Sequence, residues 1–115
     1  MVSVLLIDDD DDFREEIRIG LERAGFRMTA VESGDDGVEI FKQDPHDVVI
    51  TDVVMDRGEG IGTMNRLHNL APGLPVIAVS GHEDYLKTMK KLGAAHSLFK
   101  PFKLASLIEA LGEVA

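Results

Sequence analysis

The chain has 115 residues, 44% of them hydrophobic and 29% charged, which is typical of one soluble globular domain spanning residues 1–115. Its formal charge of −9 argues against direct nucleic-acid binding, because non-specific binding depends on basic residues that neutralise phosphates. The absence of cysteine excludes disulfides and thiolate metal sites, and the apolar stretch at positions 1–7 is far shorter than a membrane span, so we expect a cytoplasmic protein.

The first segment predicts a buried strand followed by an amphipathic helix. Val4–Ile7 is an uninterrupted apolar run, as in strands that are covered on both faces. Five aspartates, Asp8 to Asp12, follow it. The helix is indicated by apolar residues at spacings of three and four, namely Phe13, Ile17, Leu21 and Ala24. We expect Asp11 or Asp12 to cap its N-terminus and Gly25 to end it.

The next segments predict a second strand and helix and then a central strand. Met28–Val31 is a weaker strand, and Ser33 can cap a helix that stops before Asp44-Pro45. The stretch Asp47–Asp52 contains four consecutive Val, Ile or Thr residues, which favour a pleated strand. Because its apolar residues do not alternate with polar ones, we expect both faces of this strand to be covered.

The second half of the chain continues the same alternation. A helix over 61–71 is ended by a Pro-Gly pair, and a buried-type strand follows at Val76–Val79. A fourth helix over 85–92 stops at a glycine, a short strand follows at Ser97–Phe99, and apolar residues at helical spacing predict a fifth helix over 104–114.

Five strands that alternate with five helices are typical of an α/β protein with a doubly wound parallel sheet and helices on both faces. The carboxyl ends of parallel strands lie along one edge, and ligands bind in the crevice beyond that edge. The polar residues that follow the predicted strands should therefore meet there: Asp8, Asp9, Asp52, Ser80 and Lys100.

These side chains together suit phosphoryl chemistry. Three neighbouring carboxylates repel one another unless a positive charge joins them, and Mg²⁺ is a hard cation that binds carboxylates, water and phosphate oxygens. Lys100 supplies a point charge suited to phosphate, and Ser80 a neutral hydrogen-bond donor. The set fits an aspartate that attacks phosphorus and carries the phosphoryl group as an acyl phosphate.

Other polar residues have simpler interpretations. Capping and compensation of the helix dipole explain Asp10, Asp11 and Asp12, which precede or begin the first helix. The four histidines show no metal-ligand spacing, and we expect them to be surface or loop residues: His46, His68, His82 and His96.

Four motifs, in order and at the right spacing, resemble the response-regulator receiver domain of two-component signalling over essentially the entire chain. They are Leu5-Leu6-Ile7-Asp8-Asp9, Val49-Ile50-Thr51-Asp52-Val53-Val54-Met55, Val76-Ile77-Ala78-Val79-Ser80-Gly81 and Phe99-Lys100-Pro101-Phe102. The resemblance implies a flavodoxin-like fold with strand order 2-1-3-4-5.

The resemblance also implies residue roles. Asp52 would be the phosphoacceptor, and Ser80 and Lys100 would bind the phosphoryl group. The Mg²⁺ ligands would be Asp8, Asp9, Asp52 and the backbone carbonyl of Val54. The side chains of Val54 and His82 would modulate dephosphorylation.

The implied donor is a phosphohistidine on a sensor histidine kinase or a histidine phosphotransfer protein. A downstream effector protein, or a second copy of the chain, would bind the face formed by the fourth helix, the fifth strand and the fifth helix. No output domain is expected within residues 1–115, so the chain would be a stand-alone regulator or the receiver of a longer protein.

Three departures from the family pattern concern how the signal is passed on. Asp56 stands where the family usually has proline, which makes the loop more acidic and less rigid. Ser97 occupies the switch position, where Tyr or Phe is usual. The stretch from Ser80 to Lys100 is also slightly shorter than is common.

Two other functions are alternatives to a signalling receiver. Magnesium-dependent phosphatases with an aspartate nucleophile also join Asp, Ser and Lys on such a fold, but they usually carry an Asp-x-Asp pair after the first strand and need a cap domain. A pseudo-receiver that only docks to other proteins is disfavoured, because all five chemical positions are filled.

Overall fold

Strands and helices alternate throughout the computed structural model, which describes residues 1–54 and 60–115. The elements are β1 (Ser3–Ile7), α1 (Asp11–Arg23), β2 (Arg27–Val31), α2 (Gly34–Gln43), β3 (Val48–Asp52), α3 (Gly60–Leu70), β4 (Val76–Ser80), α4 (Glu83–Lys91), β5 (His96–Phe99) and α5 (Leu104–Val114). Each strand begins and ends within one residue of its predicted position. Asp56 and the other residues of 55–59 lie outside the described part.

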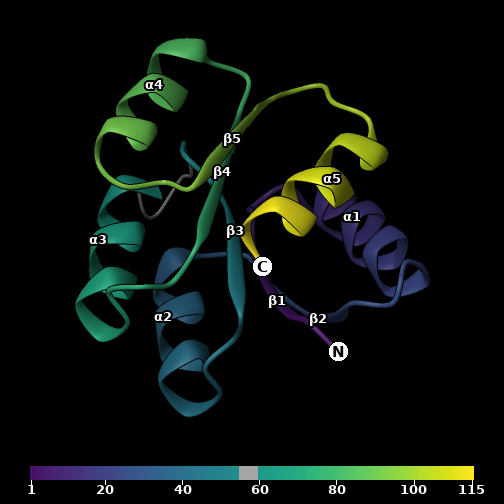
Figure 1. The fold of residues 1–115 in the computed structure, drawn as a ribbon, viewed down its shortest axis with the longest axis horizontal. Coiled ribbons are helices and arrows are strands. Elements are labelled where there is room, and N and C mark those ends of the chain that lie inside the picture. Colours follow the sequence, from purple (N-terminus) through teal and green to yellow (C-terminus); the bar gives the residue numbers. More distant parts are fainter. Residues whose placement is uncertain (55–59) are drawn as a thin grey trace.

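The five strands form one parallel sheet in the order β2-β1-β3-β4-β5, which confirms the predicted doubly wound, flavodoxin-like architecture (Figure 1). β1 therefore pairs with β3, its neighbour in space but not in sequence, and Ile7 lies opposite Thr51. On the other side of β3, Asp52 lies opposite Val79 of β4. This register brings the carboxyl ends of β1, β3 and β4 to one edge.

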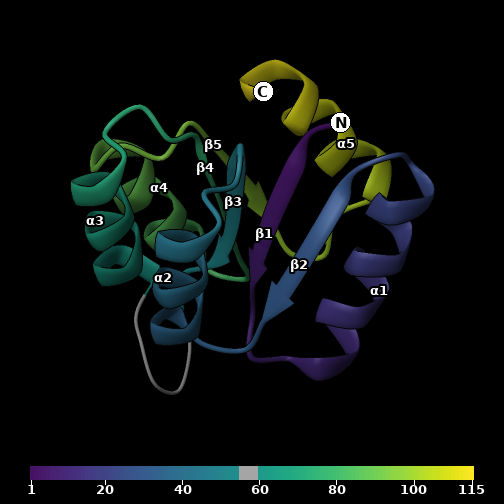
Figure 2. The ribbon, with the colours of Figure 1, turned by 90° about the horizontal axis from the view of Figure 1, so that it is seen from below.

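Helices cover both faces of the sheet. Figures 1 and 2 show α2, α3 and α4 on one face and α1 and α5 on the other. The strands are buried on both sides because alternate residues enter two separate cores: Leu5 and Val49 pack with α2, α3 and α4, while Leu6 and Ile50 pack with α1 and α5. Among the described residues, no helix is long and apolar enough to cross a membrane.

The first helix begins one or two residues earlier than we expected. The N-cap is Asp10, not Asp11 or Asp12, and its side chain accepts hydrogen bonds from the N–H groups of Asp12 and Phe13. Since α1 starts at Asp11, the other two aspartates fall in its first turn, where they compensate the helix dipole. The predicted cap of α2, Ser33, is confirmed by its hydrogen bond from the Asp36 N–H.

The prediction that the four histidines are surface or loop residues is confirmed for His82, which is exposed, and for His46, which lies in the loop before β3 although it is buried. It is wrong for His68 and His96, which are half-buried within α3 and β5. His46 is 4% exposed, and its Nε2 hydrogen-bonds with the Thr29 hydroxyl at 2.9 Å. Its Nδ1 is buried without a hydrogen-bond partner among the described residues. His96 is part of β5, where its Nε2 lies 3.2 Å from a carboxylate oxygen of Glu113.

Candidate functional site

Three carboxylates meet at the carboxyl edge of the sheet. Asp8 and Asp9 directly follow β1, and Asp52 is the last residue of β3. One carboxylate oxygen from each of the three lies within 4.8 Å of the other two. The Asp8 side chain is fully buried and that of Asp52 is 13% exposed, whereas Asp9 is exposed.

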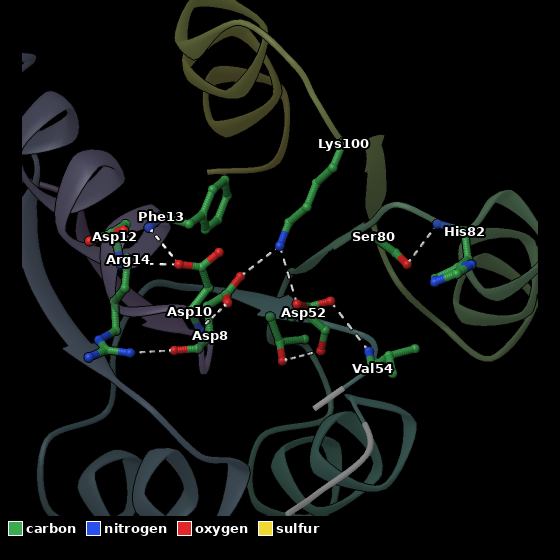
Figure 3. A network of polar contacts seen from close by, with 11 residues as sticks. Asp8, Asp10, Asp12, Phe13, Arg14, Asp52, Val54, Ser80, His82 and Lys100 are labelled. Atoms are coloured by element: carbon green, nitrogen blue, oxygen red, sulfur yellow. Dashed lines mark hydrogen bonds and ion pairs between the residues drawn. The ribbon is translucent and has the colours of Figure 1, made fainter. Parts of the chain in front are cut away.

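Lys100, which follows β5, reaches the same carboxylates from another part of the chain (Figure 3). Its Nζ donates to Asp8 Oδ2 at 2.9 Å and to Asp52 Oδ2 at 3.2 Å. The lysine therefore bridges the ends of β1 and β3 and supplies a positive charge in the cluster.

Local backbone contacts hold Asp8 in place. The Asp10 N–H donates to Asp8 Oδ1 at 2.9 Å, so the turn that leads into α1 also orients the carboxylate. From the first turns of α1, Arg14 Nη1 donates to the Asp8 carbonyl oxygen at 2.8 Å. The run of aspartates thus places a buried carboxylate and a helix cap two residues apart.

Burial and charge shift the pKa values of the ion pair. Burial raises the pKa of the Asp8 carboxyl, against the opposing effects of the Asp10 N–H and of Lys100. For Lys100, burial alone would lower the pKa of the ammonium, but the hydrogen bond and charge of Asp8, together with Asp52, outweigh it and raise that pKa. Lys100 is therefore a permanent positive charge at neutral pH.

A glycine contact closes the site behind Asp52. A Cβ on Gly60, the first residue of α3, would lie 2.3 Å from the Asp52 carbonyl oxygen and 2.7 Å from the Cα of Val53. The Gly60 N–H donates to the Val53 carbonyl at 2.7 Å. Only a residue without a side chain allows α3 to approach the end of β3 this closely.

The other predicted site residues lie beside the cluster. The Val54 N–H donates to Asp52 Oδ1 at 3.3 Å, and the Val54 side chain is 48% exposed. In the described part of the chain, the Ser80 hydroxyl accepts a hydrogen bond from the His82 N–H at 3.0 Å (Figure 3). The His82 ring packs edge-on against Tyr85, with the ring centroids 5.3 Å apart.

The structure thus brings Asp8, Asp9, Asp52 and Lys100 together and places Ser80 on the neighbouring strand. Three residues that shape the site were not predicted from the sequence: Phe13, Arg14 and Gly60. Phe13 was assigned only to the apolar face of the first helix, although its position directly after the aspartates was a signal. Nothing in the sequence pattern separates Gly60 from other loop glycines.

The donor set of this cluster suits a hard divalent cation. All three side chains offer carboxylate oxygens, the ligands that Mg²⁺ prefers, and Asp8 offers them from a fully buried position. Nitrogen or sulfur ligands, which softer metals prefer, do not take part in this cluster.

Comparison with known proteins gives consistent matches. The profile of the response regulator receiver domain matches residues 4–112. The transcriptional regulatory protein CseB of Streptomyces coelicolor is 34% identical over 113 residues, covering 96% of this chain and 48% of CseB. The chemotaxis protein CheY of Halobacterium salinarum is 31% identical, covering 97% of this chain and 95% of CheY. A response regulator receiver domain protein from Clostridium thermocellum has a similar crystal structure, with a TM-score of 0.93 at 28% identity, covering 99% of this chain and 94% of that one.

The matched region contains all four motifs on which the resemblance rests. The chain spans about half the length of CseB and nearly the whole length of CheY. These matches favour a signalling receiver over an aspartate-nucleophile phosphatase.

Proposed function

Because this chain belongs to the response regulator receiver domain family and is a phosphorylation-controlled signalling switch, we propose that Asp52 accepts the phosphoryl group. One observation carries the assignment. Asp52 ends the central strand with its side chain 13% exposed, so a donor can reach it, and it lies beside a permanent positive charge on Lys100. Asp8, the other carboxylate in contact with Lys100, is fully buried and inaccessible to a donor.

We propose that Asp8, Asp9 and Asp52, with the backbone carbonyl of Val54, hold a Mg²⁺ ion. The support is the close spacing of the three carboxylates and their all-oxygen chemistry. When bound, Mg²⁺ supplies charge neutralisation for the phosphoryl oxygens. A cation on Asp8 and Asp52 would replace part of the role that Lys100 has in the metal-free protein, which leaves the ammonium available for a phosphoryl oxygen.

In the proposed reaction, a carboxylate oxygen of Asp52 attacks the phosphorus of a phosphohistidine. The new O–P bond gives an acyl phosphate, the P–N bond breaks, and the imidazole leaves with the electron pair and takes up a proton from water. Lys100 stabilises the charge on the transferring oxygens, and Ser80 would turn its hydroxyl from the His82 amide to donate to one of them. The donor protein would be a sensor histidine kinase or a histidine phosphotransfer protein.

For the downstream partner we propose the face of α4, β5 and α5. A groove of about 440 Å³ lies between α4 and β5, and its lining includes Leu86, Ser97 and Phe99. Ser97 fills less of this space than the usual aromatic residue would, so signal transfer should depend on movement of α4 or of the loop before it.

The charge of this groove favours an acidic segment of an effector protein. Its lining carries a net positive charge, from three lysines against one glutamate (Lys87, Lys90, Lys91 and Glu83), although the chain as a whole carries a charge of −9. A symmetric pair of chains joined through the same groove would place these lysines against one another, which is unfavourable. We therefore favour an effector over a second copy.

Incubation with a small acyl-phosphate donor and Mg²⁺, followed by intact-mass measurement, tests the central claim. Wild type should gain the mass of one phosphoryl group and Asp52→Asn should gain none, because an amide is not an acyl nucleophile. Asp12→Asn, an exposed aspartate in the first turn of α1, is the matched control and should be phosphorylated like wild type. A mass gain in Asp52→Asn would refute the assignment.

A further inference from the structure

Lys100 has a third neighbour besides the two carboxylates. Its Nζ lies 4.1 Å from the centroid of the Phe13 ring, well within the distance of about 6 Å at which the face of an aromatic ring attracts a cation. The Lys100 side chain is 23% exposed, so the ammonium is partly removed from water and the attraction is less screened. Figure 3 shows the Phe13 ring and the Lys100 amine on the same side of the carboxylates.

The position of Phe13 is fixed from two directions. Its N–H donates to the capping carboxylate of Asp10 at 3.1 Å, so the ring is tied to the same turn that orients Asp8. On its other side, Phe13 meets the ring of Phe102 at right angles, with a centroid separation of 6.0 Å. These two contacts place the face of the Phe13 ring beside the Lys100 ammonium.

A lysine has a long flexible side chain, so its ammonium can leave a site when the carboxylates that bind it become ligands of a cation. In this chain the carboxylates that hold Lys100 belong to the three that we assign to the cation. The Phe13 ring offers no oxygen ligand and does not compete for the cation site, so it can retain the ammonium while the carboxylates change partners. Phe13 thus differs from Asp8 and Asp52, which would have to bind both Lys100 and the cation.

We propose that Phe13 is a positioning residue for phosphoryl transfer, which holds the Lys100 ammonium at the carboxylate cluster through the face of its ring. The role rests on the proposed function of Asp52 and Lys100. It differs from the packing of Phe13 against the aliphatic side chains of α1 and α5, to which the ring also contributes, because that packing depends on the volume of the ring and not on its electron density.

The contact itself is tested first, in the metal-free protein and without phosphorylation. The Lys100 side-chain protons should show ring-current shifts in the NMR spectrum that disappear in Phe13→Leu and persist in Phe13→Trp. In a double-mutant cycle with Lys100→Met, the effects of Phe13→Leu and Lys100→Met on unfolding should be non-additive. Unshifted lysine protons together with additive effects would overturn the contact, whatever the fate of Asp52.

The role in phosphoryl transfer is tested by placing mono-, di- and trifluorinated phenylalanine at position 13. Fluorination withdraws electron density from the ring face with little change of volume, so the initial rate with a small acyl-phosphate donor should fall stepwise, by about two- to fivefold in total. The same series at Phe26, in the same core cluster but outside the site, should leave the rate unchanged. A constant rate across the series at position 13 would overturn the positioning role, while absence of phosphorylation in wild type would instead refute the proposed function.

Discussion

At the scale of single residues, neighbours decide what identical side chains do. Asp8 is a buried member of the carboxylate cluster, Asp10 caps a helix, and Asp11 forms an exposed ion pair with Arg14. The three differ because β1 ends at Ile7 and α1 begins at Asp11, so each aspartate falls at a different point of the turn between them. Only the first of them lies deep enough to contact Lys100.

Residue 54 is expected to set the lifetime of the acyl phosphate. Hydrolysis needs a water aligned with the phosphorus, and the exposed valine side chain can neither donate nor accept a hydrogen bond to hold it. Val54→Asn should therefore speed the loss of phosphate about fivefold, because one hydrogen bond contributes about 1 kcal/mol. The measurement is the decay of the phosphorylated mass peak from pH 5.5 to 8.

The competing candidate is His82, two residues beyond Ser80. Its ring packs against Tyr85, which holds it on the α4 side of the site. If Val54 controls the lifetime, decay should depend only weakly on pH and His82→Phe should resemble wild type. A decay that depends strongly on pH across this range and is lost in His82→Phe would assign control to His82 instead.

At the scale of elements, side chains join the strands at the edge opposite the site. Asp47, just before β3, accepts hydrogen bonds through Oδ2 from the Ser3 N–H at 2.8 Å and from the Ser3 hydroxyl at 3.1 Å. Its own N–H donates to the Ser3 hydroxyl at 3.0 Å. These bonds connect the start of β1 to the start of β3, which helps to set the register that brings Asp8 and Asp52 together at the far end.

These bonds predict a pH dependence of stability. The backbone N–H and the hydroxyl of Ser3 hold the pKa of the Asp47 carboxyl below its ordinary value of 3.8. A group whose pKa is lowered by folding stabilises the protein above its unfolded-state pKa, and this stabilisation is lost as the pH falls through the folded-state pKa. Asp47→Asn should therefore be less stable than wild type near pH 7, with a deficit that shrinks at pH values below about 4.

Urea unfolding between pH 2.5 and 7 measures this difference. Glu109→Gln, which removes an exposed carboxyl on α5, is the control and should leave the pH profile as in wild type. A deficit of Asp47→Asn that stays constant down to the lowest pH would show that the Ser3 contacts do not depend on the carboxylate charge.

At the scale of the whole molecule, three of the 21 acidic side chains lie together where the cation is proposed to bind. In the metal-free protein, Lys100 offsets part of the repulsion among Asp8, Asp9 and Asp52. At the proposed site Mg²⁺ would bind only the folded arrangement of these residues, so saturation should stabilise the fold by mass action, by about 2.7 kcal/mol at 100 times Kd.

Thermal unfolding with and without Mg²⁺, at matched ionic strength, measures this gain. Asp9→Ala removes one ligand from the cluster and should abolish most of the gain, whereas Asp12→Ala, in the first turn of α1, should retain it. Equal gains in Asp9→Ala and wild type would contradict the site and indicate general screening of the −9 charge.

The amino-acid sequence by itself determined the alternation of strands and helices, and with it the fold class. Apolar runs and helical spacing indicate which residues are buried. Parallel strands bring their carboxyl ends to one edge of the sheet. From these two rules, Asp8, Asp9, Asp52, Ser80 and Lys100 could be assigned to one site, although the strand order came from the family resemblance.

Only the tertiary structure decided which groups touch within that edge. Periodicity does not say what covers a residue, so the burial of His46 and the approach of Gly60 to the end of β3 were not predictable. The contact between Phe13 and Lys100 joins residues far apart in the chain, and it exists because the Lys100 side chain reaches from the end of β5 to Asp8, beside the start of α1. Such contacts depend on the packing of whole elements, which local sequence patterns do not encode.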